Sequence, residues 1–295
     1  MENFRLKVFR VVAAHLNFSR AAEELLLSQP AVTLQIRALE EELGVSLFDR
    51  QGGRIALTPG GRSLLPYAQK LKDISDEAAA AVASTSEIQA GSLSIGASQT
   101  IGQYLLPNLL AGFLRSNPRV AITVISGNSD QMLESLIAHK TQISLVEGPA
   151  LRKDVHIEPF MEDQLVLAVP ASHEWAGMEI GLDLLKSAPL LMREFGSGTR
   201  RVIESALAGY GIPRKDLRIR MELDSTEGLL NAVESGLGLT FVSQWAARNH
   251  LALGTINLAH ICGLRLARNF SLAYPSGPAP SGTVAAFRAY LHAIS

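Results

Sequence analysis

The segment "LSQPAVTLQIRALE", residues 27–40, decides how the N-terminal part of the chain folds. Ser28 is a typical helix N-cap, and Pro30 falls in the first turn, where its missing backbone N–H interrupts no hydrogen bond. Apolar residues then recur at helical spacing and predict one buried face: Val32, Ile36 and Leu39. The helix is expected to end at Gly44, because glycine suits the left-handed conformation that follows a helix. The uncharged polar side chains at the leading end of this helix are therefore predicted to face outward.

A second, shorter helix precedes this one and is joined to it by a tight turn. We expect it to span residues 19–26, with Ser19 as its N-cap. Two short strands, residues 47–48 and 54–57, follow the longer helix, and Thr58 and Pro59 start another helix. Two short helices around a tight turn are typical of a helix-turn-helix, whose second helix enters the major groove of DNA with its N-terminal end leading.

The side chains at that leading end match what base recognition requires. Gln29 could bond an adenine edge at two points, and Ser28 and Thr33 could bond several bases. Basic residues suited to phosphate contacts lie further along the helix and in the hairpin after it: Arg37, Arg50 and Arg54. However, helical hairpins also occur in protein interaction domains, and the first 62 residues hold eight basic and seven acidic residues. Spacing and charge alone therefore leave both a DNA-binding and a purely structural role open.

A long helical pattern follows, from Thr58 to about residue 88. Its apolar and small side chains are spaced nearly as a heptad: Leu64, Ala68, Leu71, Ser75, Ala78 and Val82. A lone helix of this length could not bury such a stripe. A partner chain that packs along it is the simplest solution, so the sequence predicts a homodimer formed through this helix.

From residue 90 onward the sequence changes character. Short β-rich runs, such as "LSIGAS", "VAITVISG" and "LVLAVP", alternate with helical segments at residues 101–115, 129–138, 199–210 and 226–235. This alternation is typical of βαβ units, and it predicts an open, mostly parallel sheet. About 205 residues are enough for two lobes.

The segment "FSRAAEELLLSQPAVTLQIRALEEELGVSLFDRQGGRIALTPGG", residues 18–61, resembles the N-terminal domain of LysR-type transcriptional regulators. The resemblance implies an α+β multidomain protein that binds double-stranded promoter DNA and a small-molecule effector. Its parts would be a winged helix-turn-helix, a dimerising linker helix, and a two-lobed α/β effector domain like type II periplasmic binding proteins. The expected bounds are 1–60 for the first part, 61–89 for the linker, 90–162 with 268–295 for lobe I, and 163–267 for lobe II.

The same resemblance implies roles for individual residues and an assembly. Pro30 joins Ser28, Gln29 and Thr33 as a base-facing residue, and Arg50 and Arg54 lie near the wing. A homodimer, and beyond it a homotetramer, is expected. "TIGQYLLP" and "LVEGP" resemble the branch of the family tied to sulfur assimilation and sulfite response.

Two loops in the part of the chain after residue 90 place hydroxyl residues just before a helix. The first is Ser98-Gln99-Thr100, and the second is Ser197-Gly198-Thr199. Hydroxyls and free amides at helix N-termini suit a small carboxylate or oxyanion, although ordinary helix capping also explains them. Because the resemblance implies effector binding at the first loop, we expect both loops to bind a small anionic effector between the lobes.

Glu147 follows a predicted strand and could lie close to these loops. Its carboxylate would repel a bound anion unless it were protonated or paired with Arg193 or Arg200. We therefore expect Glu147 to be a cap or a structural ion-pair partner rather than an effector-binding residue.

The composition fits a globular protein with ample core material. Apolar residues make up 47% and charged residues 19% of the 295 residues, and the net charge is −1. No apolar run is long enough to cross a bilayer, and basic residues interrupt the N-terminal segment, so we expect a cytoplasmic protein without membrane span or signal peptide. Cys262, the single cysteine, is expected to be a small buried apolar residue, and no metal or cofactor is expected.

The motifs of common enzyme classes are missing from the sequence. There is no phosphate loop, HExxH motif or nucleophile elbow. A ligand-responsive DNA-binding regulator, and not an enzyme, is therefore the main interpretation. The second interpretation is a small-molecule-binding protein or enzyme whose N-terminal helices merely associate.

Overall fold

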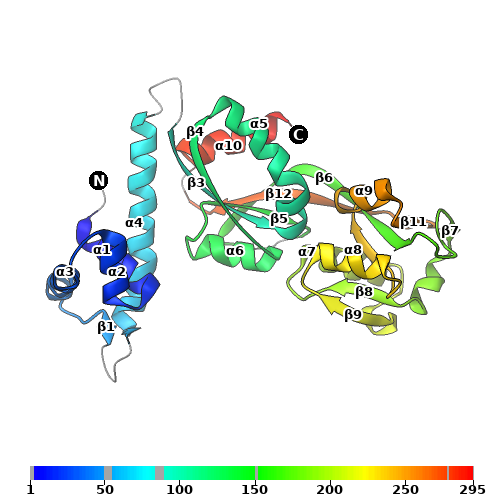
Figure 1. Cartoon of the computed structure of the whole chain (residues 1–295), viewed down its shortest axis with the longest axis horizontal. Coiled ribbons are helices and arrows are strands. Elements are labelled where there is room, and N and C mark those ends of the chain that lie inside the picture. Colours follow the sequence, from blue (N-terminus) through cyan, green and yellow to red (C-terminus); the bar gives the residue numbers. More distant parts are fainter. Residues whose placement is uncertain (1–2, 50–54, 84–89, 150–151, 278, 295) are drawn as a thin grey trace. The chain divides into compact units, whose positions relative to one another are not determined.

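The computed structural model describes residues 3–49, 55–83, 90–149, 152–277 and 279–294. The chain divides into two units, Met1–Glu87 and Ile88–Ser295, and each is described by itself. The first unit is mainly helical, and the second is built around a large sheet with helices packed against it (Figure 1).

Helices and a two-stranded ribbon make up the first unit: α1 (Phe4–His15), α2 (Phe18–Leu25), α3 (Gln29–Leu43), β1 (Phe48–Asp49), β2 (Ala56–Leu57) and α4 (Pro59–Ala83). Strands β1 and β2 pair antiparallel. Phe48 packs against Phe9 and Phe18, with ring centroids 5.5 and 5.7 Å apart, at the centre of one apolar core. Because α1, α2 and α3 all contribute to this core, it fixes how α3 is held against the other two helices.

The N-cap of helix α2 lies two residues earlier than its sequence pattern predicted. Asn17 is its N-cap, because the Asn17 side chain accepts hydrogen bonds from the backbone N–H groups of Ser19 and Arg20. The prediction that Ser19 caps this helix is therefore wrong. Asparagine is as good a cap as serine, and here it comes first in the chain.

Helix α3 has the boundaries that its sequence predicted. The Ser28 hydroxyl accepts a hydrogen bond from the Ala31 N–H, and Pro30 lies in the first turn. Gly44 ends the helix with a φ of 67°, which glycine adopts without strain.

Helix α4 packs its first turns against the core of the first unit. At Gly61 a Cβ atom would lie 2.2 Å from the Leu47 carbonyl oxygen, so only glycine permits this approach. Leu64 and Ala68 also contact the core, so the expectation that they face a partner chain is wrong. Among the α4 side chains that the structure describes, the exposed large apolar ones are Tyr67, Leu71 and Ile74.

The second unit contains an eight-stranded sheet within the described residues, in the order β4-β3-β5-β12-β6-β11-β7, with β10 paired to β6. The strands are β3 (Ala90–Ser98), β4 (Arg119–Gly127), β5 (Ile143–Glu147), β6 (Val155–Pro170), β7 (Glu179–Ile180), β10 (Thr240–Ser243), β11 (Ile256–Ile261) and β12 (Leu266–Pro275). Strands β8 (Leu190–Arg193) and β9 (Ile219–Leu223) form a separate parallel pair.

Helices cover this sheet and fill the connections between its strands. The α-helices are α5 (Leu106–Ser116), α6 (Ser129–Ile137), α7 (Gly198–Gly209), α8 (Thr226–Glu234), α9 (Gln244–Leu253) and α10 (Gly282–Ala293). A π-helix, η2 (Ile101–Leu105), precedes α5, and short 3-10 helices occur at η3 (Leu182–Lys186) and η4 (Arg214–Asp216).

The prediction of a mostly parallel sheet is wrong, because the sheet is mixed. Strands β3, β4 and β5 are parallel to one another, but β12 runs antiparallel to both β5 and β6. Strands β10 and β11 are also antiparallel to β6. The two long strands β6 and β12 run through the whole second unit and tie its halves together (Figure 1).

Two main hydrophobic cores define two lobes in the second unit. The core of lobe I contains side chains from Leu93 to Phe160 and, after a long gap in sequence, from Phe270 to Leu291. The core of lobe II contains side chains from Leu165 to Leu266. Because β6 and β12 contribute to both cores, the chain passes between the lobes along these two strands.

Candidate functional site

The leading end of α3 presents the predicted base-facing residues at the surface of the first unit. Ser28, Gln29 and Pro30 are exposed, and Thr33 is partly exposed. The Gln29 side-chain amide donates a hydrogen bond to the Thr33 hydroxyl at 3.0 Å, which holds the two side chains together. The opposite side of the helix is buried in the core through Val32, Ile36 and Leu39. This arrangement leaves one polar end of α3 free to meet a groove of DNA.

The basic residues predicted near this surface are only partly described. Arg37 is exposed on α3, whereas Arg50 and Arg54 lie outside the described residues. The ribbon itself is tied to α3, because the Glu40 carboxylate accepts hydrogen bonds from the backbone N–H groups of Leu47 and Phe48, the shorter at 2.7 Å. The Glu40 side chain of α3 therefore holds the start of the ribbon beside this helix.

In the second unit, the first predicted loop lies where β3 ends. Ser98 and Thr100 are buried, and Gln99 is partly exposed. The Thr100 hydroxyl donates a hydrogen bond of 3.2 Å to the Glu147 carboxylate at the end of β5. Because β3 and β5 are parallel neighbours, their carboxyl ends meet at one edge of the sheet.

The second predicted loop reaches the same place from lobe II. Ser197 caps α7 by accepting a hydrogen bond from the Arg200 N–H, and Gly198 packs directly on the Glu147 carbonyl. The Thr199 hydroxyl accepts a hydrogen bond of 2.7 Å from the Arg268 guanidinium. The structure thus brings both loops to the junction of the lobes, around Glu147.

Arg268, on β12, links the two loops and was not predicted. Its guanidinium forms ion pairs of 2.7 Å with Glu147 and with Asp163 of β6, and all three side chains are buried. Asp163 also accepts a hydrogen bond from the Ser243 hydroxyl at 2.7 Å. Burial outweighs these favourable contacts and raises the pKa of the Asp163 carboxyl.

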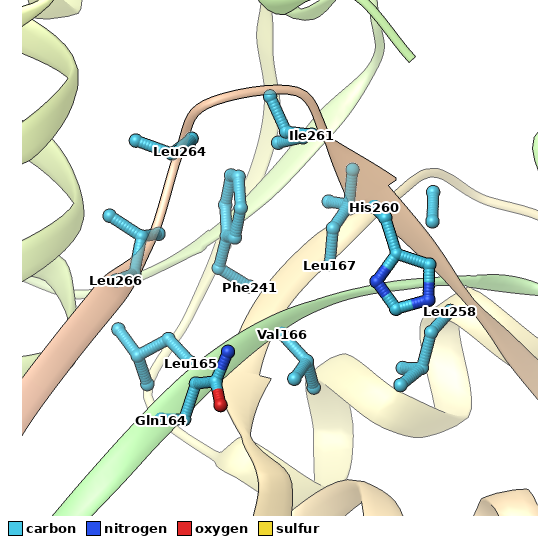
Figure 2. A pocket seen from close by; sticks show the side chains of 11 residues that line it. Gln164, Leu165, Val166, Leu167, Phe241, Leu258, His260, Ile261, Leu264 and Leu266 are labelled. Carbon is cyan, nitrogen blue, oxygen red and sulfur yellow. The ribbon is translucent and has the colours of Figure 1, made fainter. Parts of the chain in front are cut away.

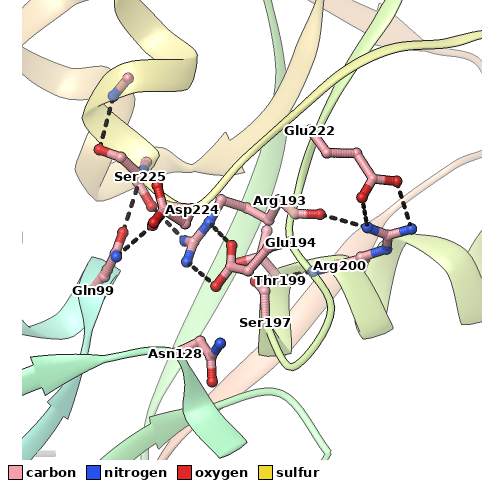
Figure 3. A network of polar contacts seen from close by, with 12 residues as sticks. Gln99, Asn128, Arg193, Glu194, Ser197, Thr199, Arg200, Glu222, Asp224 and Ser225 are labelled. Atoms are coloured by element: carbon pink, nitrogen blue, oxygen red, sulfur yellow. Dashed lines mark hydrogen bonds and ion pairs between the residues drawn. The ribbon is translucent and has the colours of Figure 1, made fainter. Parts of the chain in front are cut away.

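The expectation that Glu147 is an ion-pair partner is confirmed, but the predicted arginines are the wrong ones. Arg193 binds Glu194 and the Thr226 hydroxyl, and Arg200 binds Glu222 and Glu204. Figure 3 shows Arg193 and Arg200 engaged within lobe II, beside the second loop. Arg268 is the arginine that neutralises Glu147.

Hydrogen bonds and an ion pair join the two lobes on both sides of this junction. On one side the Gln99 amide donates to the Asp224 carbonyl and accepts from the Thr226 N–H (Figure 3). On the other side Asn128 donates to the Phe195 carbonyl, and Asp130 pairs with Arg201 at 2.8 Å. The lobes are therefore held close together around the two loops.

Several buried polar atoms at the junction lack a hydrogen bond within the described residues. They are Ser98 Oγ, Glu147 Oε2 and Arg268 Nη2. The last two contact each other as an ion pair of 2.7 Å without hydrogen-bond geometry. Buried polar atoms are normally hydrogen-bonded, so these three atoms keep hydrogen-bonding capacity that a polar ligand could use.

A small cavity lies elsewhere in lobe II, between β6, β10, β11 and the turn into β12 (Figure 2). Its volume is about 50 Å³, and its mainly apolar lining includes Leu165, Leu167, Phe241 and Leu266. This volume holds a water molecule or two and is too small for an organic effector.

Cys262 lies in the turn before β12 and is exposed, so the prediction that it is buried is wrong.

Metal-ion sites and membrane-spanning helices are both missing from the part of the chain that the structure describes. No group of three or more histidine, cysteine, aspartate or glutamate side chains there is arranged to hold a metal ion. No helix in the described ranges is long and apolar enough to span a membrane.

The fold defines a helix-turn-helix protein with a two-lobed binding domain. The family model "Bacterial regulatory helix-turn-helix protein, lysR family" matches residues 4–62, and the model "LysR substrate binding domain" matches residues 86–294. The chain belongs to the LysR family of transcriptional regulators, whose members are regulators and not enzymes.

Individual relatives agree with this assignment. A probable RuBisCO transcriptional regulator of Cyanophora paradoxa is 34% identical over 272 residues, which cover 91% of this chain and 84% of that protein. The HTH-type transcriptional regulator CysL of Bacillus subtilis is 34% identical over 267 residues, covering 90% and 88%. The name CysL gives the resemblance to the sulfur branch weak support, because RuBisCO regulators match equally well.

Solved structures are similar over one or both units. Full-length CbnR, crystallised with its target DNA, has a TM-score of 0.70 and 25% identity, and the match covers 100% of both chains. The regulatory domain of CcmR from Synechocystis PCC6803, in complex with 2-PG, has a TM-score of 0.63 and 25% identity. That match covers 69% of this chain and 96% of the CcmR domain.

Proposed function

We propose that this regulator binds its operator through the leading end of α3 and responds to a small anion bound at the junction of its lobes. The observation that carries the effector site is the group of buried polar atoms without a hydrogen bond at Ser98, Glu147 and Arg268. The six residues predicted for effector binding surround this place: Ser98, Gln99, Thr100, Ser197, Gly198 and Thr199.

Hydrogen-bond donors and the N-terminal end of α7 support an anionic effector. The Arg268 guanidinium is fully buried and lies against Thr199, at the N-terminal end of α7. A helix N-terminus and a buried guanidinium both favour negative charge. The complex of the CcmR regulatory domain with 2-PG shows that a similar domain binds a small molecule.

For DNA binding we propose that Ser28, Gln29, Pro30 and Thr33 face bases and that Arg37 contacts phosphate. We also retain Arg50 and Arg54 as wing contacts. In a homodimer, two α3 helices would lie about 34 Å apart in successive major grooves. The crystal structure of CbnR with its target DNA supports this mode of binding.

The domain bounds and the assembly belong to the same proposal. We assign residues 1–60 to the DNA-binding domain, 61–89 to the linker, 90–162 with 268–295 to lobe I, and 163–267 to lobe II. The sequence ranges of the two hydrophobic cores support the division into lobes. The regulator would act as a homodimer or homotetramer in the cytoplasm, where its promoter DNA lies.

As a mechanism, we propose that the bound effector changes how the lobes meet and thereby the spacing of the DNA-binding units in the oligomer. The contacts that join the lobes on both sides of the junction support this coupling. Footprinting and DNA bending with and without effector test it. An effector that binds and leaves both unchanged would contradict the mechanism.

A gel-shift experiment tests the DNA-binding surface, using the promoter region next to the gene of this protein. Gln29→Ala should weaken specific binding by about 1–3 kcal/mol, because it removes a base contact. Arg37→Ala should weaken binding to all sequences and lower the salt slope by about 1. Gln103→Ala, an exposed substitution in the second unit, is the matched control. A specific complex that is insensitive to Gln29→Ala would refute this assignment.

Thermal denaturation with candidate anions tests the effector site, since a bound ligand stabilises the folded state by mass action. Thr100→Val should reduce the ligand-induced rise in Tm. Thr141→Val is the matched control, because Thr141 is equally buried but lies before the opposite end of β5. Equal ligand effects on both variants would place the site elsewhere.

A further inference from the structure

The hydrogen-bonding direction of the Thr100 hydroxyl is fixed by its neighbour. A threonine hydroxyl has one proton to donate and two lone pairs that accept. Thr100 donates its proton to the Glu147 carboxylate at 3.2 Å, and a carboxylate can only accept. The lone pairs of Thr100 are therefore what this residue can offer to a ligand.

The Thr199 hydroxyl is an acceptor in its hydrogen bond, whereas the Thr100 hydroxyl is a donor. It accepts a hydrogen bond of 2.7 Å from Arg268, and a guanidinium has no acceptor atom. Thr199 therefore keeps its own proton, which it can donate to a ligand. Because Glu147 and Arg268 form an ion pair with each other, the acceptor beside Thr100 and the donor beside Thr199 are held in position together.

The remaining groups at the junction include both donors and acceptors. Ser98 Oγ is buried without a partner in the described residues and can act either way. Arg268 Nη2 can donate, whereas Glu147 Oε2 can only accept. An anion without a proton of its own would satisfy the donors but would face the lone pairs of Thr100 and the charge of Glu147.

We propose that the effector is a small anion that carries at least one O–H group, such as a hydroxy acid or hydrogenphosphate. Its charged oxygens accept from Thr199 and Arg268, and its O–H donates to Thr100 or Glu147. Fully deprotonated sulfate is rejected, because one of its oxygens would have to lie against an acceptor. This inference rests on the proposed effector site and specifies the chemistry of its ligand.

Asp163 has a different role from Glu147. Its carboxylate oxygens are engaged by the Arg268 Nε–H and the Ser243 hydroxyl, each at 2.7 Å. Asp163 is therefore a positioning residue that orients Arg268. The selection for an O–H group comes from Glu147 and Thr100.

Matched pairs of anions test the proposal with the full chain. Calorimetric titration gives Kd for hydrogenphosphate and sulfate, which share size and shape, and for L-malate and succinate, which differ by one hydroxyl. We expect the O–H-bearing member of at least one pair to bind about tenfold more tightly or better, since a buried acceptor left unpaired costs affinity. A preference for hydrogenphosphate over sulfate indicates a hydrogenphosphate-like effector, and a preference for L-malate over succinate indicates a hydroxy acid.

Two variants connect the preference to these residues. In Glu147→Gln the side-chain amide can donate to the ligand, so the preference should fall to about threefold or less. Thr100→Val removes the other acceptor, so it should also lower the preference, and it tests the proposal if Glu147→Gln does not fold. The preference should persist in Thr141→Val, which lies away from the junction.

The outcomes separate this inference from the function on which it rests. If sulfate and succinate both bind as tightly as their O–H-bearing partners, and binding is lost in Thr199→Val, the inference is overturned and the anion site stands. A preference that survives both Glu147→Gln and Thr100→Val would also overturn it. If none of the four anions binds the wild-type chain at millimolar concentration, the anionic effector proposed above is refuted as well.

Discussion

Gly198 is the residue at which α7 comes nearest to β5. A Cβ atom at this position would lie 1.8 Å from the Glu147 carbonyl oxygen and 2.8 Å from the Ser129 hydroxyl. No side chain other than hydrogen fits there without displacing backbone. The close approach brings the flanking residues Ser197 and Thr199 to the end of β5, so the geometry of the proposed effector site depends on this glycine.

Gly198→Ala should therefore lower the free energy of unfolding by about 1–3 kcal/mol, as overpacking does in other cores. Gly209→Ala, at the other end of the same helix, is the matched control, because a Cβ there meets no atom within 4 Å. That substitution should be neutral or stabilising by up to about 1 kcal/mol, since alanine favours the helix. Urea denaturation of both variants measures the difference. Equal stability of the two would contradict the tight contact between α7 and β5.

At the residue scale, the sequence predicts features that depend on neighbouring residues, such as helix caps, but not contacts between distant residues. Ser28 and Gly44 could be identified as caps because capping depends on residues a few positions away. Arg268 could not, because it lies in an ordinary strand and its partners Glu147, Asp163 and Thr199 are distant in sequence. Burial of Cys262 was mispredicted because nothing in its neighbours shows that it falls in an exposed turn.

At the scale of elements, a polar cluster fastens the last helix to the sheet. Glu158 of β6 forms two hydrogen bonds with the Arg288 guanidinium of α10, at 2.7 and 2.8 Å. It also accepts from the Tyr274 hydroxyl of β12 and contacts His292. The hydrogen bonds from Arg288, above all, lower the pKa of Glu158 to about 2.

This lowered pKa predicts a pH-dependent contribution to stability. Because the folded pKa lies below the ordinary value of about 4.5, the ionised form is favoured in the folded state. The contribution is fully present above that ordinary value and is lost as the pH falls toward 2. Glu158→Gln should cost about 1–2 kcal/mol at pH 7, after allowance for solvent screening, and progressively less below pH 4.5.

Chemical denaturation of wild type and Glu158→Gln between pH 3.5 and 7 measures this effect. Glu179→Gln, at an exposed glutamate of β7, is the control and should show a small difference at every pH. A cost of Glu158→Gln that stays constant across the range would show that the ion pair with Arg288 contributes nothing through charge.

Sheet topology is the element-scale feature that the sequence did not reveal. The runs that became β3, β5, β6 and β10 could be identified as strands, and the segments between them as helices. The direction of pairing could not, because β12 meets β6 about a hundred residues later in the chain. Alternating βαβ patterns favour parallel pairing, and two long antiparallel strands outweighed that tendency here.

At the scale of the whole molecule, α4 carries the surface that assembly requires. Tyr67, Leu71 and Ile74 are 65%, 49% and 59% exposed, and their spacing of four and three residues places them on one face of the helix. Leu64 and Ala68 are already used by the core of the first unit. The homodimer proposed above would therefore bury a stripe that is rotated from the one inferred from the heptad pattern.

Leu71→Glu should consequently dissociate the dimer, because it places a charge at the centre of this apolar stripe. Sedimentation velocity at micromolar concentration should show a smaller species, and operator affinity should fall, since a monomer holds only one α3 helix. Lys72→Glu is the matched control: Lys72 is partly exposed and, at about 100° per residue, lies on a different side of α4 from Tyr67, Leu71 and Ile74. It should keep the assembly of the wild type. If Leu71→Glu sediments like Lys72→Glu, the subunits do not associate through the face that contains Tyr67, Leu71 and Ile74.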